Sequence, residues 1–507
     1  MRDSRLSRRQ VLAGTGTLWG VAGLDLLSHG RAAAGAGSRG VPVSAELEPL
    51  VRMIEETPRD KLVEAAAARI RAGAGYRELL AATFLAGVRS IHARPVGFEF
   101  HCVLAVHAAH LSAQAGPADQ RFTPLFWAMD AFKDSQQVKR GKGEGDWVLP
   151  VLDPAKLPPP EQARRRYIEA MAAWDEEGAD LAIAALVRST PPEKIRDLLF
   201  RHGARDFRDI GHKAIYTANA WRTLTSIGWQ HAEPVLRSLT FGCLDHEGTN
   251  PAQRDDPADR PWRENLDRLG KVRAGWTEGQ IDPGAVTALL HGLRRASAGE
   301  SCAMVVGLLN GKIAPTSLWD GLHLYASELV MRKGDIIALH AVTSINALHQ
   351  AFSLSTDAET RLLMLLQAAA YLPLFREELA DNDRGGPRVD GLKTGPTNSI
   401  KADGDGTVAQ IFADVGPRTP RAAQTALAWL DQDRHQGAAL LDQGRRLLFA
   451  KGRTAHHYKF AAAAFEDFAQ VSPAHRNRYL AANLGLLRGS HEPDNPLITR
   501  AHMALRG

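Results

Sequence analysis

Apolar residues recur every three to four positions along most of the chain. This spacing places them on one face of an α-helix, whereas segments with strict alternation and hairpin turns are scarce. Helices that each present one apolar face pack into an all-α fold. The pattern therefore predicts a multi-helix array or bundle. Clear examples are Leu47, Leu50, Val51 and Ile54, then Leu80, Phe84, Leu85 and Val88, and later Leu362, Leu363 and Leu366.

Two stretches depart from the helical pattern. Residues 116–160 contain the polar run Lys139–Gly143 and three consecutive prolines, and residues 381–407 are rich in Gly, Pro, Asp and Asn. Such compositions are typical of loops. We expect two long loops within a single helical domain that spans residues 45–507, because the helices on either side of each loop can share one core.

The first residues differ in character from the rest of the chain. A basic region with the pair Arg8 and Arg9 precedes a moderately apolar segment from Ala13 to Leu27, and a run of small residues then ends at Ala36. That order is typical of a secretory signal peptide, and the paired arginines indicate the twin-arginine type. We expect residues 1–36 to be a twin-arginine signal peptide and the mature protein to be exported, for example to the periplasm.

The charge of the mature chain gives no indication of a nucleic-acid partner. The 62 Lys and Arg residues exceed the 57 Asp and Glu residues by five, and the predicted signal peptide carries three of these net positive charges. No basic run with interleaved aromatic residues follows it. No later window offers the roughly 20 apolar residues that span a bilayer, so we expect no integral membrane segment in the mature form.

Three cysteines are too few and too widely spaced to predict a disulfide framework. Each lies among apolar residues, which indicates a buried free thiol. They are Cys102, Cys243 and Cys302.

Histidines carry the candidate chemistry. The chain has 19 of them, and four lie within apolar helical segments, where an imidazole needs a hydrogen-bond acceptor or a metal ion to offset its burial. For any single one, a core histidine that is satisfied locally is the simpler interpretation. Four together favour a metal site built from one histidine on each of several helices, which would make the helical array surround a central histidine-lined site. The four are His101, His212, His340 and His456.

Spacing along the helices restricts which residues can act together. Lys459 follows His456 by three residues and therefore shares its helix face. His340 and His349 are nine residues apart, on opposite faces, so at most one of them faces a given site. Neither an H-E-x-x-H motif nor a Glu-x-x-His pair occurs, which argues against a zincin and against a ferritin-like di-iron centre.

Four segments resemble the questin oxidase-like family. The run from Leu339 to Ser344 is similar to that family's L-H-x-V-T-S segment, and the spacing of His456 and Lys459 is similar to its H-x-x-K segment. The segment that begins Gly211-His212, and His101 with the apolar run after it, follow the family's order along the chain. Members include Baeyer–Villiger-type and anthraquinone ring-cleaving oxygenases. Their site is a mononuclear non-haem iron held by four histidines and a carboxylated lysine.

The resemblance implies a ligand set for this chain. Phe100 stands where the family has an asparagine before the first histidine, so His107 and His110 remain alternatives for that ligand. Imidazoles with one carboxylate-like oxygen suit Fe²⁺, and zinc, copper or manganese ions bind similar sets. The implied metal ligands are His101, His212, His340 and His456, with Lys459 as the carboxylated lysine.

The function implied by the resemblance is that of an exported metal-dependent oxygenase. It would use dioxygen on a small organic substrate, aromatic or polyketide-like in kind. Tyr216 lies one turn after His212 and is the candidate catalytic residue that orients the substrate, and Asp209 is a candidate acceptor for an imidazole proton.

Two alternatives belong to other classes. One is a non-catalytic exported helical protein, a scaffold or binding module whose buried histidines are structural. The other is a histidine phosphatase, because the segment from Arg201 to Arg205 reads Arg-His-Gly-Ala-Arg. That motif requires a strand-to-loop setting, whereas the flanking residues predict helix.

Overall fold

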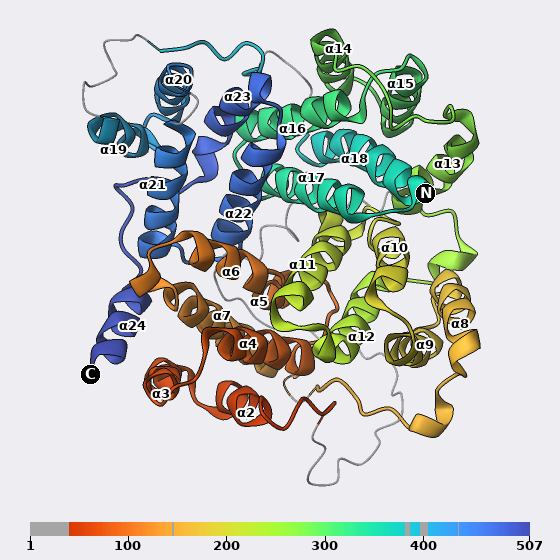
Figure 1. The fold of residues 1–507 in the computed structure, drawn as a ribbon, viewed down its shortest axis with the longest axis vertical. Helices are drawn as coiled ribbons and strands as arrows, with labels where there is room; N and C mark the ends of the chain where they lie inside the picture. The colour runs from red at the N-terminus through yellow and green to blue at the C-terminus, as the bar shows by residue number, and fades with distance from the viewer. Residues whose placement is uncertain (1–39, 144, 146, 381–385, 396–403, 434–435) are drawn as a thin grey trace, which may run out of the picture.

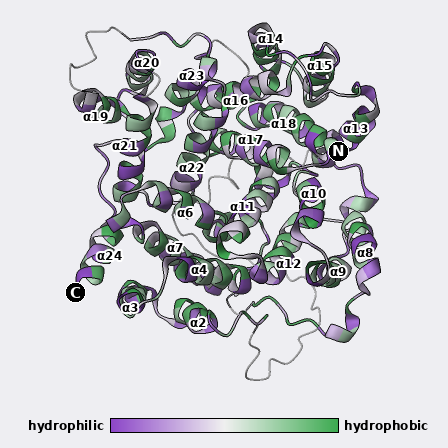
Figure 2. Ribbon diagram, viewed as in Figure 1, coloured by the Kyte–Doolittle hydropathy of each residue, from purple (hydrophilic) through white to green (hydrophobic). Residues whose placement is uncertain are grey.

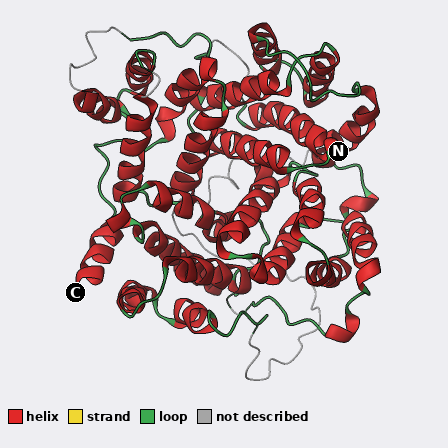
Figure 3. Ribbon diagram, in the orientation of Figure 1, coloured by secondary structure: helices red, strands yellow, loops and turns green. Residues whose placement is uncertain are grey.

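The computed structural model describes residues 40–143, 145, 147–380, 386–395, 404–433 and 436–507. Within these residues the regular structure is helical, and the β-type pairing consists of one isolated bridge between Gln280 and Ile313. Figure 3 shows helices joined by loops throughout. The all-α fold predicted from residue spacing is thus confirmed. The predicted signal peptide lies outside the described residues.

Most helices of the first half lie in the lower part of the view in Figure 1. Helix α2 packs on α4, α3 packs on α7, and α8 packs on α9. Their bounds are α2 (Glu48–Glu56), α3 (Arg59–Arg71), α4 (Tyr76–Ser90), α5 (His101–Leu104), α6 (Val106–Ala115), α7 (Thr123–Gly141), α8 (Pro160–Ala173), α9 (Glu176–Ser189), α10 (Pro192–Gly203), α11 (His212–Ile227) and α12 (Ala232–Cys243).

The helices of the second half complete the array. Helix α17 contacts α11, α16, α18 and α22, and α22 also contacts α6, so these helices lie around the centre of the molecule (Figure 1). The bounds are α13 (Arg260–Arg268), α14 (Pro283–Leu293), α15 (Ala298–Asn310), α16 (Pro315–Arg332), α17 (Ile336–Leu354), α18 (Ala358–Glu378), α19 (Gly404–Asp414), α20 (Thr419–Leu430), α21 (Gln436–Lys451), α22 (Ala455–Gln470), α23 (Pro473–Asn483) and α24 (Pro496–Arg506).

The prediction of a long loop at residues 116–160 is wrong over much of that stretch. Helix α7 occupies Thr123–Gly141, because Phe126, Met129 and Phe132 recur at helical spacing and are buried. In the second expected loop, residues 386–395 form turns and irregular chain, and α19 begins at Gly404. The rest of that loop lies outside the described residues.

Two apolar clusters form the interior. The larger one draws on α14 to α23, and the other draws on α2 to α9 and α12. Helix α11 contributes to both, with Ile215 in the first and Tyr216 in the second. Figure 2 shows that individual helices carry hydrophobic and hydrophilic residues on different faces. The three cysteines are buried free thiols, as expected from their surroundings.

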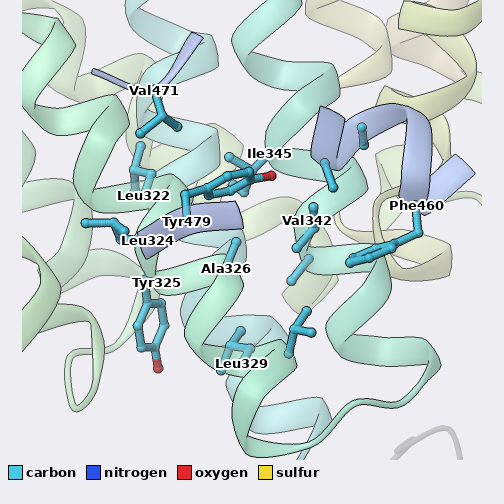
Figure 4. Packing of buried hydrophobic residues seen from close by; sticks show 14 of the residues in the cluster. Leu322, Leu324, Tyr325, Ala326, Leu329, Val342, Ile345, Phe460, Val471 and Tyr479 are labelled. Carbon is cyan, nitrogen blue, oxygen red and sulfur yellow. The ribbon is translucent and has the colours of Figure 1, made fainter. Parts of the chain in front are cut away.

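Side chains of α16, α17, α22 and α23 interdigitate in the larger cluster (Figure 4). Leu322 and Leu329 of α16 and Ile345 of α17 are fully buried. Burying one such side chain stabilises the fold by about 1.5–3 kcal/mol, so this packing holds α16 and α17 together. Within the described residues, no helix combines the length and the apolar character that crossing a bilayer requires.

Candidate metal centre

Four histidine side chains meet where the two apolar clusters adjoin. His101 is the first residue of α5, His212 is the first of α11, His456 is the second of α22, and His340 lies one turn into α17. The imidazole rings of His101 and His340 each contact those of His212 and His456. Residues that are far apart in the sequence are therefore brought into one cluster, which we call the imidazole cluster.

The nitrogen atoms of the cluster lie close together. One ring nitrogen from each of His101, His340 and His456 lies within 4.8 Å of the other two. His212 is outside that mutually close trio, yet its Nε2 lies 2.9 Å from the Nε2 atoms of both His101 and His340. We therefore count His212 as the fourth member, because its Nε2 lies in direct contact with two imidazoles of the cluster.

The backbone before His212 is shaped for this position. Asp209, Ile210 and Gly211 all have positive φ, at 51°, 48° and 80°. Non-glycine residues in this region cost of order 1–3 kcal/mol each, and such strain concentrates at functional sites. A Cβ added to Gly211 would lie 2.3 Å from the Ser344 Oγ, so only glycine fits there. The turn aims the carbonyl of Asp209 at the imidazole of His212.

Backbone carbonyls fix the tautomer of three of the imidazoles. A carbonyl oxygen only accepts hydrogen bonds, so each Nδ1 that bonds to one must carry the proton, and the Nε2 of the neutral ring is then unprotonated. The three Nδ1 atoms donate from His101 to Phe98 O over 2.7 Å, from His340 to Ile336 O over 2.6 Å, and from His212 to Asp209 O.

The cluster therefore presents unprotonated nitrogens to one another. Two such nitrogens at 2.9 Å repel unless a proton or a cation lies between them. Two nitrogens bound at about 2.1 Å to one metal ion, about 90° apart, would be separated by about 3.0 Å. The Nε2 of His456 is buried and has no partner among the described residues. The donor set fits a metal ion.

Electrostatics disfavour a proton as the bridging cation. Burial holds the pKa values of His101, His212 and His340 well below the ordinary value, and the Lys459 ammonium adds to the effect. The same causes lower the pKa of His456 to about 3. The rings are therefore neutral at pH 7, which is the form that binds metals.

Lys459 lies beside the cluster. Its Nζ is 3.5 Å from the His340 Nε2, and its side chain is almost fully buried. Burial lowers the pKa of Lys459 to about 7. His212 and His456 lie in the first turns of their helices, where the helix dipole is positive. Those helix ends favour neutral imidazoles and would stabilise an anionic group at this position.

The alternative first ligands lie outside the cluster. His110 Nδ1 is 3.1 Å from the Tyr76 hydroxyl. His107 is buried and lines a small cavity between α6, α11, α17 and α22. Within α5 and α6, His101 is the histidine whose Nε2 reaches the other imidazoles.

The structure does not bring the Tyr216 hydroxyl to the cluster. That hydroxyl donates to Ser238 Oγ over 2.9 Å, and the ring packs edge-on against Phe100 in the second apolar cluster. Asp209 contacts the His212 imidazole through its backbone carbonyl and not through its carboxylate. Burial and, to a smaller extent, the neighbouring Asp245 carboxylate raise the pKa of the Asp209 carboxyl to about 8.

The segment that resembles a phosphatase motif lies at the end of a helix. His202 is within α10, which runs to Gly203, so the strand-to-loop setting that the motif requires is not found there. Arg201 bonds to Asp357, which caps the start of α18, and to Thr360 in its first turn. The Asp357 carboxylate balances the charge of Arg201.

Sequence reasoning missed the polar residues next to the cluster. Arg222 donates to Asn346 Oδ1 over 3.0 Å and to Glu466 Oε2 over 2.5 Å. Asn346 in turn donates to Asp467, whose other oxygen accepts from Tyr479. Arg222 and Glu466 each follow the histidine of their helix by ten residues, and Asn346 follows His340 by six. At about 100° per residue these separations do not place them on the same helix face as the histidines, so no periodicity in the sequence marked them.

Comparisons with known proteins gave no match: no protein-family model, no curated protein and no solved structure is significantly similar to the chain.

Proposed function

We propose that the chain is a metal-dependent oxygenase whose single divalent ion is held by His101, His212, His340 and His456. The observation that carries this proposal is the 2.9 Å separation between unprotonated imidazole nitrogens, a contact that requires a cation. Iron is the proposed metal, on the resemblance of the His340 and His456 segments to the questin oxidase-like family. Zinc, copper and manganese bind similar donors.

Bound iron would supply one-electron redox chemistry toward dioxygen. The protein's own residues prepare the site. Carbonyls of Phe98, Asp209 and Ile336 hold three rings in the tautomer that offers Nε2 to the metal, and such acceptors increase the basicity of a ligating imidazole. The apolar packing around His340 excludes water. The substrate is proposed to be a small aromatic or polyketide-like molecule.

Lys459 is proposed to contribute an anionic oxygen after carboxylation of its amine. The support is its position: an ammonium beside four imidazoles would repel a metal cation, whereas a carbamate would attract it. Its Nζ lies near His340 Nε2, and no carboxylate of the described residues pairs with it. The positive ends of α11 and α22 also favour an anion here.

The test is metal analysis of the full chain purified from its natural compartment. We expect about one iron per chain, and loss of that iron in His340→Ala. His349→Ala on the same helix is the matched control, because His349 bonds to His323 and not to the cluster. Metal-free protein with unchanged melting after chelation would refute the proposal and favour an exported binding or scaffold protein with structural histidines.

A further inference from the structure

A larger cavity lies at the surface, between α2, α3, α7 and α24. Its volume is about 660 Å³. None of these four helices carries an imidazole of the cluster, so this surface cavity is separate from the candidate metal centre. Pockets that bind small organic molecules are typically about 300–1,000 Å³. The volume is therefore sufficient for such a ligand, and the charges in the cavity wall indicate its kind.

Lys133 of α7 is a buried cation in the wall of the surface cavity, and its partners are neutral. It is 4% exposed, and its Nζ donates to the backbone oxygen of Glu55 over 2.7 Å and to Gln136 Oε1 over 3.0 Å. An ammonium has three N–H donors, so one donor remains for a ligand. The buried Lys213, by contrast, pairs with the Asp206 carboxylate. A buried charge is costly unless it is paired, so Lys133 lacks a counter-ion that an anionic ligand would supply.

Arg140 adds a second cation to the same wall. It follows Lys133 by seven residues, which places both on one face of α7. Arg140 is exposed, and within the described residues it forms no ion pair. Burial and, to a smaller extent, the Arg140 charge lower the pKa of Lys133 to about 8, and the nearby carboxylates of Glu55 and Glu56 offset this only in part. The two cations therefore act on the same space.

The N-terminus of α3 opens into the surface cavity as well. Pro58 occupies the N-cap position, and no side chain caps the helix. The first backbone N–H groups, those of Arg59 and Asp60, therefore have no acceptor within the helix. Residues 57–60 line the cavity, and N–H groups at a helix N-terminus favour an anion.

The carboxylates around the surface cavity are either paired or exposed. Asp130 accepts two hydrogen bonds from Arg59, each over 2.8 Å, and Glu55 pairs with an arginine outside the cavity wall. Glu56 and Asp60 are exposed, so water screens their charges. The buried end of the cavity, beside Lys133, is therefore the position at which an anion is favoured.

We propose that the surface cavity binds a small oxyanion ligand, a carboxylate or a phosphate, between Lys133, Arg140 and the N-terminus of α3. The oxyanion accepts a hydrogen bond from the Lys133 ammonium at the buried end and from the Arg140 guanidinium nearer to solvent. The backbone N–H groups at the start of α3 complete the donor set. The exposed carboxylates of Glu56 and Asp60 disfavour a polyanion, so the ligand carries one anionic group. The site is independent of the proposed metal centre.

Binding of three probes to the full chain tests the inference. The probes are 4-fluorobenzoate, phenyl phosphate and inorganic phosphate, titrated separately and followed by ¹⁹F or ³¹P NMR. Tighter binding of fluorobenzoate would identify a carboxylate ligand, and tighter binding of either phosphate would identify a phosphate ligand. Lys133→Met should weaken binding by about 10–100-fold, the effect of losing a hydrogen bond to a charged group. Arg140→Gln should weaken it by about 2–5-fold, as expected of an exposed charge pair.

Two exposed residues provide the controls. Glu56→Gln should strengthen binding by about 2–5-fold, because it removes an opposing charge. Arg166→Gln changes an exposed arginine of α8, outside the surface cavity, and should leave the affinity at the wild-type value. No binding of any probe, or equal affinities in the wild type, Lys133→Met and Arg140→Gln, would overturn the oxyanion site and would leave the metal proposal standing. If Lys133→Met does not fold, the opposite effects of Arg140→Gln and Glu56→Gln decide.

Discussion

Replacing Lys459 by methionine should stabilise the metal-free protein. The lysine side chain is almost fully buried, and burial lowers its pKa from 10.5 to about 7. The unfolded chain keeps the proton up to about pH 10.5, so folding below that pH must either release it or bury a charge. Each pKa unit is worth about 1.4 kcal/mol, and the shift therefore costs up to about 5 kcal/mol at pH 7. Methionine has a similar length and no such cost.

The pH dependence gives the sign of the effect. The cost is absent above pH 10.5, grows as the pH falls, and is complete near pH 7, where the folded protein also begins to bind the proton. Chemical denaturation of chelator-treated, carbon dioxide-free protein should show Lys459→Met more stable by up to about 5 kcal/mol at pH 7 and by about 1.4 kcal/mol at pH 9.5. The same variant should lose metal binding, which would make Lys459 a residue kept for function at the expense of stability.

Lys213 provides the matched control. It is also fully buried, but its Nζ donates to Asp206 Oδ2 over 3.0 Å and to Asp245 O over 2.6 Å. Lys213→Met should destabilise the protein by about 1.5–3 kcal/mol, because it removes a charged hydrogen-bond donor from the buried Asp206 carboxylate. Arg208, 3.2 Å from the same carboxylate, remains as its ion-pair partner. A Lys459→Met variant that is less stable than the wild type at pH 7, or whose effect does not change with pH, would refute the reasoning about a desolvated amine.

Two further predictions concern the imidazole cluster. Acidification from pH 7 to pH 5 should destabilise the metal-free chain by about 2 kcal/mol for each buried imidazole. The unfolded chain takes up protons near pH 6.5, whereas the folded chain, with its lowered pKa values at His212 and His340, does not. Urea titrations at several pH values give the free energy of unfolding as a function of pH. Its slope should be smaller by up to about 2.7 kcal/mol per pH unit in the His212→Asn/His340→Asn double variant, and an unchanged slope would contradict the lowered pKa values. Gly211→Ala should lower stability by about 1–3 kcal/mol and weaken zinc binding measured by competition with a chelator, because its Cβ would collide with Ser344. Gly73→Ala, which has a positive φ and open space around it, should lower stability without changing zinc affinity, and equal zinc affinities for the two variants would argue against a role of the turn in positioning His212.

The helical class of the fold was readable from the sequence, because apolar spacing is a local property. The wrong prediction of a loop at residues 116–160 came from weighting the Gly, Pro and Lys residues near the ends of that stretch. The helical spacing of Phe126, Met129 and Phe132, which form the buried face of α7, was the better local signal. The candidate ligands were also identified locally, since His340 lies between Leu339 and Ala341 in an uninterrupted apolar run.

The geometry of the cluster could not be predicted from the sequence, because it depends on contacts between distant segments and on the backbone. The residue types of Asp209 and Ile210 do not indicate two consecutive left-handed conformations, because a β-branched isoleucine rarely adopts one, although aspartate does so more often than most residues. The acceptors for the Nδ1 protons are carbonyls, which every residue possesses, so no motif marks them. The role assigned to Tyr216 came from its distance along the helix alone, and its hydroxyl finds Ser238 on α12 instead.

The location of the cluster explains how a metal ion would act on the whole fold. His340 and His456 project from helices of the larger apolar cluster, whereas the residues on either side of His101 belong to the other cluster. Where the two clusters adjoin, neutral imidazoles replace apolar side chains and face one another at distances that repel in the absence of a cation. An ion bound by all four rings would remove that repulsion and connect the two apolar clusters. Its binding free energy would add to the free energy of unfolding. The same link requires every helix that carries an imidazole to be in place before the ion can bind, so loading the metal would depend on a chain that has already folded.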